Sequence, residues 1–370
     1  MLDVKLKLIP GHTSERVWMA ASPLRTLFWN ATYACNYHCS ICFANADTPS
    51  SEELTTREAM EMFTNAQREG VKNLIISGGE PFMRKDIVSI LSHTAKLGLE
   101  ARIASNGSLL SEEILKQLKN ETLTKSFQIS LDTLDPGLYS KFHGVSSDTL
   151  KDVLNSLRTI KAYDFHTTVS ARLTPQTLPT IPQLLDRACD EGWATVTIHI
   201  PLLTGRNGEA FPQNSDFLTL LEPAFEHFLA LPKRWLTEMF IPWAQYHRLV
   251  KRLRKKIKVV YAGCRAGRDR LTINPCGDIS LCVCFDVPEF YLGNIRRDNL
   301  NDIFHGSRMC DMMRHPHKYD ICGDCPNVMT CGGGCRVAAY AVTGRIDGRD
   351  GSCLMYNHGE NRRSKVSDAT

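Results

Sequence analysis

Residues 26–42 read TLFWNATYACNYHCSIC, an apolar stretch that runs directly into three cysteines. The first part, residues 26–32, combines aromatic, aliphatic and β-branched side chains and therefore predicts a buried strand. The second part places Cys35, Cys39 and Cys42 in a polar loop. A strand that ends in a loop of potential ligands is typical of α/β folds, in which the loops after the strands carry the chemistry.

The same alternation of apolar strands and amphipathic helices continues along the chain. Strands are predicted at residues 26–32, 71–77, 101–104, 127–131, 167–173 and 195–200. Helices are predicted, from apolar residues at helical spacing, at residues 55–69, 87–95, 111–118, 150–160 and 182–192. This repetition indicates a parallel sheet wrapped by helices, either an open doubly wound sheet or a full or partial barrel.

Composition excludes several classes of protein. The chain has 370 residues, 43% of them hydrophobic and 23% charged, with a formal net charge of +4. A balance this even gives no case for a nucleic-acid or acidic-membrane binder. No apolar run approaches the roughly 20 residues of a membrane helix, and residues 1–10 lack the apolar stretch of a signal peptide. We therefore expect a cytoplasmic protein without a membrane partner.

The unusual number is 14 cysteines, which fall into two groups. Three lie in the loop at 35–42 and ten lie between Cys264 and Cys353, while Cys189 stands alone in an apolar helical pattern and is interpreted as a buried hydrophobe. In a reducing compartment cysteines are more often metal ligands or catalytic groups than disulfides. Two modules with separate inorganic contents are expected.

The loop with Cys35, Cys39 and Cys42 has the ligand count of an iron–sulfur site. Three thiolates in so short a loop can bind three corners of a cubane cluster, which leaves one iron open to an exogenous ligand. A structural zinc ion would need a fourth protein ligand. His38 is the candidate, but it sits beside Cys39, where simultaneous ligation is sterically awkward. The loop therefore favours a cluster.

A glycine-rich turn, Gly78-Gly79-Glu80-Pro81, follows the second predicted strand. Together with the CxxxCxxC loop, it resembles the radical S-adenosylmethionine (SAM) superfamily. The resemblance implies a partial (β/α)6 TIM-like barrel and a cluster on Cys35, Cys39 and Cys42. In that family the open iron chelates the amino and carboxylate groups of SAM, and the glycines let the backbone approach the ligand closely.

The resemblance also implies which residues contact SAM. The glycine turn would bind the methionyl end, and Ile-Ser-Leu-Asp at the end of the fourth strand would contact the ribose. An arginine at the end of the fifth strand would pair with the carboxylate, although a surface role for it is the alternative. The implied SAM-binding residues are Gly78, Gly79, Glu80, Ser130, Asp132 and Arg172. The sequence Ser105-Asn106-Gly107 matches a common third-strand end. Many members place an aromatic residue before the third cysteine to pack on adenine, whereas this chain has Ile41, followed by Phe43 after the cysteine.

The C-terminal cysteines are similar, cysteine for cysteine, to the seven-cysteine SPASM extension of a subset of these enzymes, which usually holds two auxiliary four-iron clusters. The outer cluster would be bound by Cys322, Cys325, Cys331 and Cys353. The inner cluster would be bound by Cys264, Cys282 and Cys335, with Cys276 favoured as the fourth ligand over Cys284, Cys310 or an open iron. Zinc at the Cys322-x2-Cys325 pair is the competing interpretation, but it would leave surplus cysteines.

These assignments divide the chain into five parts and imply three [4Fe-4S] clusters in all. The expected parts are an N-terminal segment at 1–22, a radical SAM partial barrel at 23–206, a helical bridging segment at 207–263, a SPASM domain at 264–356 and a tail at 357–370. A basic run at 251–256 is interpreted as a solvated helical face, or else as a dock for an acidic peptide or an electron donor. Arg206 would either meet a substrate carboxylate or support its loop.

The resemblance predicts an oxidoreductase that cleaves SAM to a 5′-deoxyadenosyl radical, which abstracts hydrogen from an unactivated C–H bond. The leading hypothesis is a maturase of a ribosomally made precursor peptide. Only about 25 residues precede the first strand, so a separate peptide-recognition protein is the expected partner if one is needed, with flavodoxin or ferredoxin as electron donor. The alternatives are an enzyme acting on a tetrapyrrole side chain or a sugar alcohol, and a non-enzymatic iron–sulfur electron carrier.

Overall fold

The computed structural model describes most of the two cysteine-bearing regions. The described residues are 5–8, 22–199, 205–206, 223–224, 226–227, 230–231, 236–240, 258–261, 264–319, 322–326, 328–350 and 353. The predictions for the basic run at 251–256, for most of the bridging segment and for the tail lie outside these residues. The proposed boundaries of the five parts stay predictions.

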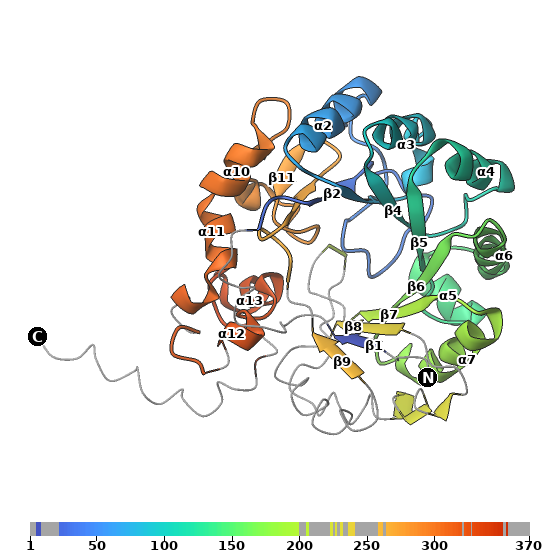
Figure 1. Ribbon diagram of the computed structural model, residues 1–370. Coiled ribbons are helices and arrows are strands. Elements are labelled where there is room, and N and C mark those ends of the chain that lie inside the picture. Colours follow the sequence, from blue (N-terminus) through green and yellow to red (C-terminus); the bar gives the residue numbers. More distant parts are fainter. Residues whose placement is uncertain are drawn as a thin grey trace, which may run out of the picture.

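One twelve-stranded sheet organises the molecule, and its middle consists of parallel strands in chain order. These strands are β2 (Thr26–Asn30), β3 (Asn73–Ser77), β4 (Glu100–Ser105), β5 (Thr124–Ser130), β6 (His166–Arg172) and β7 (Thr195–His199). The sheet curves with helices along its outer side (Figure 1). The predicted α/β class and partial barrel are confirmed, and each predicted strand matches one of these six within a few residues.

The outer helices follow the predicted apolar spacing. They are α2 (Thr56–Arg68), α3 (Ile87–Lys96), α4 (Glu112–Glu121), α6 (Thr149–Ala162) and α7 (Ile181–Glu191). In α2 the face that turns towards the strands is made of Ala59, Met62, Phe63 and Ala66, all buried. The helix begins with a capping box, in which Thr55 and Glu58 each satisfy a backbone N–H of the other.

A further helix, α5 (Pro136–His143), was not predicted from the sequence. Asp135 caps its first turn by accepting from the Leu138 N–H, and Gly144 ends it in the left-handed conformation with φ of 63°. A Cβ atom at Gly144 would lie 2.7 Å from the carbonyl oxygen of His38, so the close approach of the cysteine loop requires glycine there. The end of α5 therefore packs directly on the predicted cluster loop.

Strands from outside the barrel repeat extend the sheet at both edges. Next to β2 lie β10 (Arg270–Ile273), β11 (Asp278–Ser280) and β12 (Gly293–Asn294), and next to β7 lie β8 (Leu236–Phe240), β1 (Lys5–Leu8) and β9 (Lys258–Tyr261). Because β10 pairs in parallel with β2, the C-terminal region is joined to the barrel through the same strand that leads into the cysteine loop.

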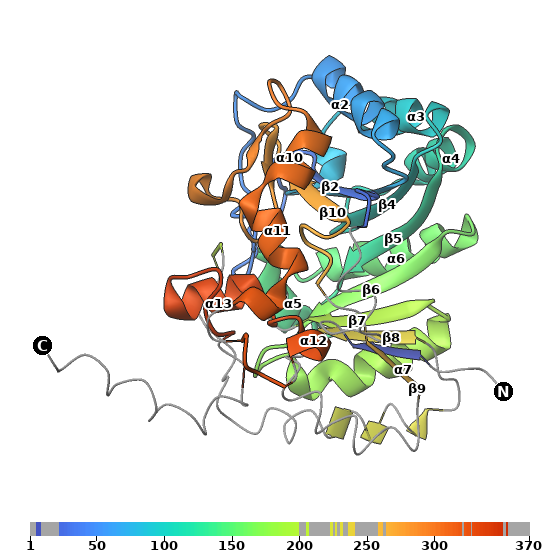
Figure 2. The same cartoon turned by 60° about the vertical axis from the view of Figure 1, so that its left-hand side comes forward.

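The C-terminal helices are short and stack beside this junction (Figures 1 and 2). They are α10 (Leu300–Gly306), α11 (Arg308–Arg314), α12 (Val328–Cys331) and α13 (Arg336–Thr343). Single-turn 3-10 helices lie at Pro81–Met83, Leu178–Thr180, Pro288–Phe290 and Pro316–Lys318. Tyr33 of the cysteine loop donates from its hydroxyl to Asp286 at 2.8 Å, which ties the two regions together near the predicted clusters.

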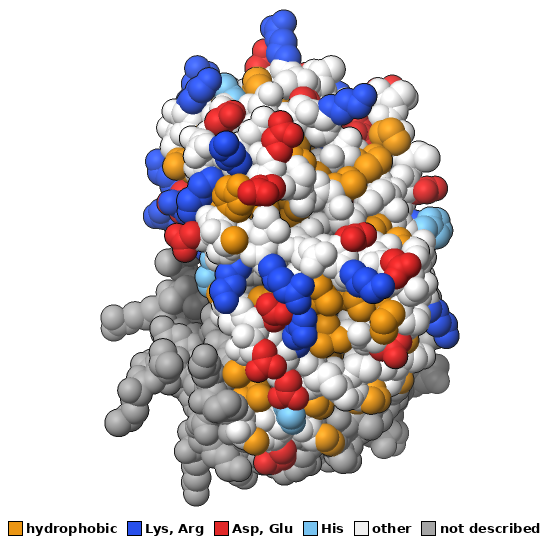
Figure 3. All heavy atoms as spheres, turned by 90° about the vertical axis from the view of Figure 1, so that its right-hand side faces the viewer, with side chains coloured by type: hydrophobic (Ala, Val, Ile, Leu, Met, Phe, Trp, Pro, Cys, Tyr) orange, Lys and Arg blue, Asp and Glu red, His pale blue; other side chains and the backbone are white. Residues whose placement is uncertain are grey.

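The barrel core consists of the apolar side chains of the strands and of the inner helix faces. Fully buried examples are Leu27, Trp29, Leu74, Ile76, Ile103, Phe127, Ile129, Val169 and Val196. Over the described part of the face formed by the outer helices, basic and acidic side chains are intermixed (Figure 3), in keeping with the small net charge. Among the described residues, no helix combines the length and the apolar character that a membrane span requires.

Candidate active site and cluster-binding residues

The cysteine loop follows β2, and its three thiols are half-buried. The backbone N–H of Tyr37 points at the Cys35 sulfur with an N–S distance of 3.4 Å, a contact that cluster ligands commonly receive. Each thiolate of a cubane binds a different iron, so three thiols on one short loop fit three corners of an iron–sulfur cluster.

The glycine-rich turn after β3 lies against the cysteine loop. Gly79 donates its N–H to the carbonyl oxygen of Thr32 at 2.7 Å, and Glu80 donates to that of Ala34 at 2.8 Å. A Cβ atom at Gly78 would stand 2.6 Å from the Thr32 oxygen, and one at Gly79 would overlap the Ala34 carbonyl. Side chains are therefore excluded from both positions. The structure brings together the two motifs that carried the resemblance.

Glu80 is fully buried beneath this turn. Its carboxylate accepts from the Ser105 hydroxyl at 2.9 Å and from the Asn106 N–H at 2.8 Å. The Ser105-Asn106-Gly107 sequence, which begins with the last residue of β4, thus positions the glutamate. Burial raises the pKa of Glu80 to about 7, although the hydrogen bonds from Asn106 and Ser105 oppose the rise.

Asp132 and Arg172 form a buried ion pair at the ends of β5 and β6. The Arg172 guanidinium lies 2.7 Å from Asp132 Oδ2 and also donates to the carbonyl oxygen of Ile41 at 3.1 Å. Burial by itself would raise the pKa of Asp132, but the charge of Arg172 and the contact with His143 outweigh it and hold the pKa far below its usual range. This pair therefore supports the cysteine loop. The predicted contacts of Asp132, Arg172 and the half-buried Ser130 with SAM stay predictions.

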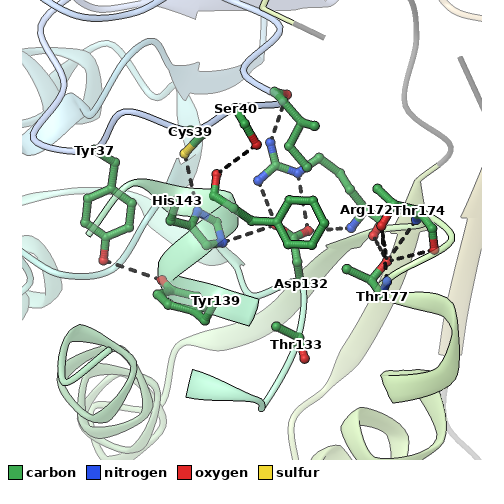
Figure 4. A network of polar contacts seen from close by, with 12 residues as sticks. Tyr37, Cys39, Ser40, Asp132, Thr133, Tyr139, His143, Arg172, Thr174 and Thr177 are labelled. Carbon is green, nitrogen blue, oxygen red and sulfur yellow. Dashed lines mark hydrogen bonds and ion pairs between the residues drawn. The ribbon is translucent and has the colours of Figure 1, made fainter. Parts of the chain in front are cut away.

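His143 at the end of α5 is the residue that sequence reasoning missed. Its Nδ1 lies 3.3 Å from the Cys39 sulfur, and its Nε2 lies 3.1 Å from Asp132 Oδ2, an ion-pair distance without the alignment of a hydrogen bond (Figure 4). The Tyr139 ring stacks at 4.2 Å from the imidazole. Burial disfavours the charged ring, but Asp132 and Cys39 outweigh it and raise the pKa of His143 to about 9. The sequence signal was the cap pattern Asp135-Pro136 with Gly144.

Arg206 supports the cysteine loop from the side of β7. Its guanidinium donates to the carbonyl oxygens of Cys39 and Ala46, both at 2.9 Å, and its backbone N–H donates to that of Cys42 at 2.9 Å. Of the two roles predicted for Arg206, these contacts favour the structural one. The loop is thus held by two charged side chains that are distant from it in the sequence, Arg172 and Arg206.

The C-terminal cysteines gather in two groups. The first group contains three thiols close enough to interact electrostatically, those of Cys264, Cys282 and Cys335. The Cys282 thiol also contacts the Cys284 side chain. Cys276 lies elsewhere, with its thiol hydrogen-bonded to Ser50 and near Glu53 and Arg296. Cys310 is fully buried in α11, near Ser307 and Arg314. Among the cysteines left over for a fourth inner ligand, the structure therefore brings Cys284, rather than the favoured Cys276, to the group.

The outer group contains Cys322, Cys325, Cys331 and Cys353, which interact electrostatically with one another. Arg336 lies among them with only 2% of its surface exposed. Its NH1 donates to the carbonyl oxygens of Ile346 and Gly348, whereas Nε and NH2 have no hydrogen-bond partner among the described residues. A buried guanidinium with unsatisfied N–H groups beside four thiols fits an anionic cluster whose sulfurs accept hydrogen bonds.

Comparison with known proteins assigns both regions to families. Residues 29–188 match the model of the radical SAM superfamily, and residues 264–326 match that of SPASM, an iron–sulfur cluster-binding domain. The AdoMet-dependent heme synthase of Methanosarcina barkeri is 26% identical over 332 residues, which cover 86% of this chain and 93% of that protein.

Two further relatives extend the comparison. The mycofactocin maturase MftC of Mycobacterium tuberculosis is 24% identical over 334 residues, covering 89% of this chain and 82% of the relative. The crystal structure of Streptococcus suis SuiB bound to its precursor peptide SuiA has the same fold, with a TM-score of 0.72 at 20% identity over 91% of this chain and 76% of SuiB. The chain is therefore an enzyme of the radical SAM superfamily that carries a C-terminal SPASM iron–sulfur domain.

Proposed function

We propose that this enzyme is an oxidoreductase that matures a ribosomally made precursor peptide by removing hydrogen from an unactivated C–H bond. The observation that carries the proposal is the contact between the three-cysteine loop and the glycine turn, because it brings a cluster site and a SAM site together. The peptide substrate is supported by the maturase relative, which aligns with 89% of the chain. A crosslink, an oxidation or a decarboxylation of the peptide would each be an oxidised product of this kind.

The residues proposed to hold the cofactors follow from the site. Cys35, Cys39 and Cys42 would bind the first [4Fe-4S] cluster, while Gly78 and Gly79 would let the backbone reach the methionyl end of SAM. When bound, the cluster and SAM supply the electron and the 5′-deoxyadenosyl radical that this superfamily uses for hydrogen abstraction. The chain itself orients the substrate carbon near the adenosyl group and excludes water, which is the protein's share in cofactor-dependent chemistry.

The C-terminal cysteines would hold two auxiliary clusters, whose chemistry is electron transfer. The outer set is Cys322, Cys325, Cys331 and Cys353, and the inner set includes Cys264, Cys282 and Cys335. A flavodoxin or ferredoxin is the proposed electron donor, and a separate recognition protein is the proposed partner for the peptide. A chain with fourteen cysteines, most of them proposed cluster ligands, suits a reducing, cytoplasmic location.

A small-molecule substrate is the second candidate function, because a heme synthase aligns with 86% of this chain. Anaerobically reconstituted and reduced enzyme distinguishes the two candidates when it is given SAM with either a deuterated peptide or a deuterated porphyrin. We expect 5′-deoxyadenosine to acquire deuterium only from the peptide. Deuterium transfer from the porphyrin alone would replace the proposal with the second candidate, and reduced enzyme that forms no 5′-deoxyadenosine with any substrate would contradict both.

Substitution of Glu80 with Gln tests the proposed SAM contact. Hydrogen bonds to charged groups contribute about 1.5–3 kcal/mol, so at pH 8 we expect SAM to bind the Glu80→Gln variant about 10- to 100-fold more weakly. The pKa of Glu80 is near 7 in the free protein. The carboxylate is therefore protonated as the pH falls, and SAM should bind the unmodified protein about tenfold more weakly at pH 6 than at pH 8.

Isothermal titration with SAM at both pH values measures these effects. The Glu80→Gln variant is also the control, since it retains the titration of the SAM amino group but has no carboxylate at position 80. A pH dependence of equal size in the variant and in the unmodified protein would show that Glu80 does not contact SAM.

The fourth ligand of the inner cluster can be identified by single substitutions. The sequence pattern favours Cys276, whereas the contact between the Cys282 and Cys284 side chains supports Cys284. We expect Cys284→Ala to alter the electron paramagnetic resonance (EPR) spectrum of the inner cluster and Cys276→Ala to leave it unchanged. Cys310→Ala is the matched control, because its thiol is buried in α11. An altered spectrum in Cys276→Ala alone would restore the prediction from sequence.

A further inference from the structure

We propose that His143 is a positioning residue for the SAM-binding cluster. Its side chain donates Nδ1–H to the Cys39 sulfur and thereby raises the reduction potential of that cluster. The inference deepens the proposed function and rests on its first step, the binding of a cluster by the loop at 35–42. It does not depend on which substrate the enzyme uses. Neither the CxxxCxxC loop nor the glycine turn contains this residue, which comes from α5.

The two groups that face the imidazole determine that His143, and not Cys39, is the donor in the contact with sulfur. Cys39 as a cluster ligand is a thiolate, and Asp132 is a carboxylate, so both can only accept. Their contacts with His143 measure 3.3 Å from Nδ1 to Sγ and 3.1 Å from Nε2 to Oδ2. Only 1% of the His143 side chain and none of that of Asp132 is exposed, so water cannot replace either partner. Because a thiolate can only accept, the 3.3 Å contact places the Nδ1–H of His143 on the cluster ligand.

The network continues from Asp132 to a second point on the same loop. Arg172 contacts Asp132 at 2.7 Å and donates to the carbonyl oxygen of Ile41 at 3.1 Å. The loop is thus contacted at Ile41 through Arg172 and at Cys39 through His143. Asp132 lies between the Arg172 and His143 side chains and contacts both (Figure 4). Asp132 restrains the imidazole, and Arg172 in turn restrains Asp132. The His143 ring therefore has little freedom to turn away from the sulfur.

The side chain and the backbone of α5 act on the loop separately. The carbonyl oxygen of His143 accepts from the His38 N–H at 3.1 Å, and that of Phe142 accepts from the Ser40 N–H at 2.9 Å. These bonds hold the loop whatever side chain occupies position 143. A substitution there therefore removes the contact with sulfur and retains the backbone support, which allows an electrostatic role to be separated from a structural one.

The expected consequence is a change in redox behaviour. Hydrogen bonds to ligand sulfurs and nearby positive charge stabilise the reduced, more negative state of a cluster and raise its potential. The effect is strong in a buried site, where the local dielectric is low. Cys35 receives a backbone donor from Tyr37, whereas the side-chain donor goes to Cys39. Loss of the imidazole should make the cluster harder to reduce.

Potentiometric titration monitored by EPR provides a readout besides activity. Among the signals of the reduced full-length protein, the SAM-binding cluster is identified as the one that changes when SAM is added. We expect His143→Leu to retain this signal with a more negative midpoint potential. His143→Asn, whose amide can reach the position of Nδ1, should lie between His143→Leu and the unmodified protein. Tyr139→Phe, which alters the neighbouring ring without touching sulfur, is the matched control and should not shift.

Each outcome decides the proposal. An unchanged potential in His143→Leu would overturn it, and so would an equal shift in Tyr139→Phe. If His143→Leu fails to fold, His143→Asn decides. A midpoint potential more negative than that of the unmodified protein would support the proposal, and an unchanged potential at full iron content would overturn it. If the unmodified protein has no SAM-sensitive signal, the proposed function itself fails. If no substrate gives a product but the midpoint potential of His143→Leu is still more negative, the proposed substrate is wrong and the role of His143 is supported.

Discussion

Replacement of Cys35, Cys39 and Cys42 together with Ala is expected to remove about four irons per chain and to abolish SAM cleavage. The loop has no other cysteine, and without thiolates it cannot hold an iron–sulfur cluster. The iron of the C-terminal region should remain, because its cysteines gather around the separate groups at Cys264 and Cys322. Iron and sulfide analysis gives the stoichiometry, and chromatographic detection of 5′-deoxyadenosine gives the SAM cleavage.

Cys189→Ala is the matched control for this triple variant. Its side chain is buried in α7, on the outer side of the barrel, and should contribute to no cluster. Iron content and SAM cleavage of this control should equal those of the unmodified protein. If the triple variant had the same iron content as the unmodified protein, the loop would not be the cluster site. If it lost all iron, the two regions would not assemble their clusters independently.

The barrel could be predicted from sequence because its elements are set by local patterns. Strands β2 to β7 are short segments with apolar or β-branched residues at most of their buried positions, and α2 shows its buried face and its capping box in the sequence itself. The cysteine loop and the glycine turn were also readable, since each is one short segment placed after a strand. Their contact follows from adjacency, because β2 and β3 are neighbours in the sheet and their ends meet at one edge.

The support of the cluster loop could not be predicted in the same way. Helix α5 has only eight residues and a weak apolar stripe, so its periodicity is faint beside that of α2. Cys39 and His143 are separated by 104 positions, and nothing local to either one indicates the other. Asp132 was recognised as a motif residue, but its partners Arg172 and His143 come from β6 and α5. The role of the Asp132 carboxylate is therefore set by residues that are distant from it in the sequence.

The inner cluster illustrates a different limit. Cysteine spacing along the chain favoured Cys276, which lies between two of the expected ligands. The described structure places Cys276 beside Ser50 and the Glu58–Arg296 ion pair, where the C-terminal region meets α2. Spacing counts residues along the chain, whereas ligation depends on which thiols the antiparallel β10–β11 turn brings to one side.

Substitution of Asp132 with Asn is expected to lower the free energy of unfolding by about 3–5 kcal/mol, the usual cost of leaving a buried ionic partner unpaired. The carboxylate is fully buried between the Arg172 guanidinium and the His143 ring, and its loss leaves the buried Arg172 without its ionic partner. Chemical denaturation of the full-length protein measures the change. Glu61→Gln is the matched control, because the Arg57–Glu61 pair is exposed and should contribute less than about 1 kcal/mol.

The pH dependence and a double substitution separate charge from packing at Asp132. Because the pKa of Asp132 is lowered in the folded protein, its stabilising effect is complete above the ordinary aspartate pKa of about 3.9 and disappears only as the pH falls below that value. The Asp132→Asn defect should therefore be full at pH 7 and shrink in strong acid. Combining it with Arg172→Met removes the unpaired cation, so the double variant should lose less stability than the two single losses added together. Additive losses of stability would mean that Asp132 and Arg172 stabilise the folded protein through packing and not through their charges. The support of the cysteine loop would then not depend on the ion pair.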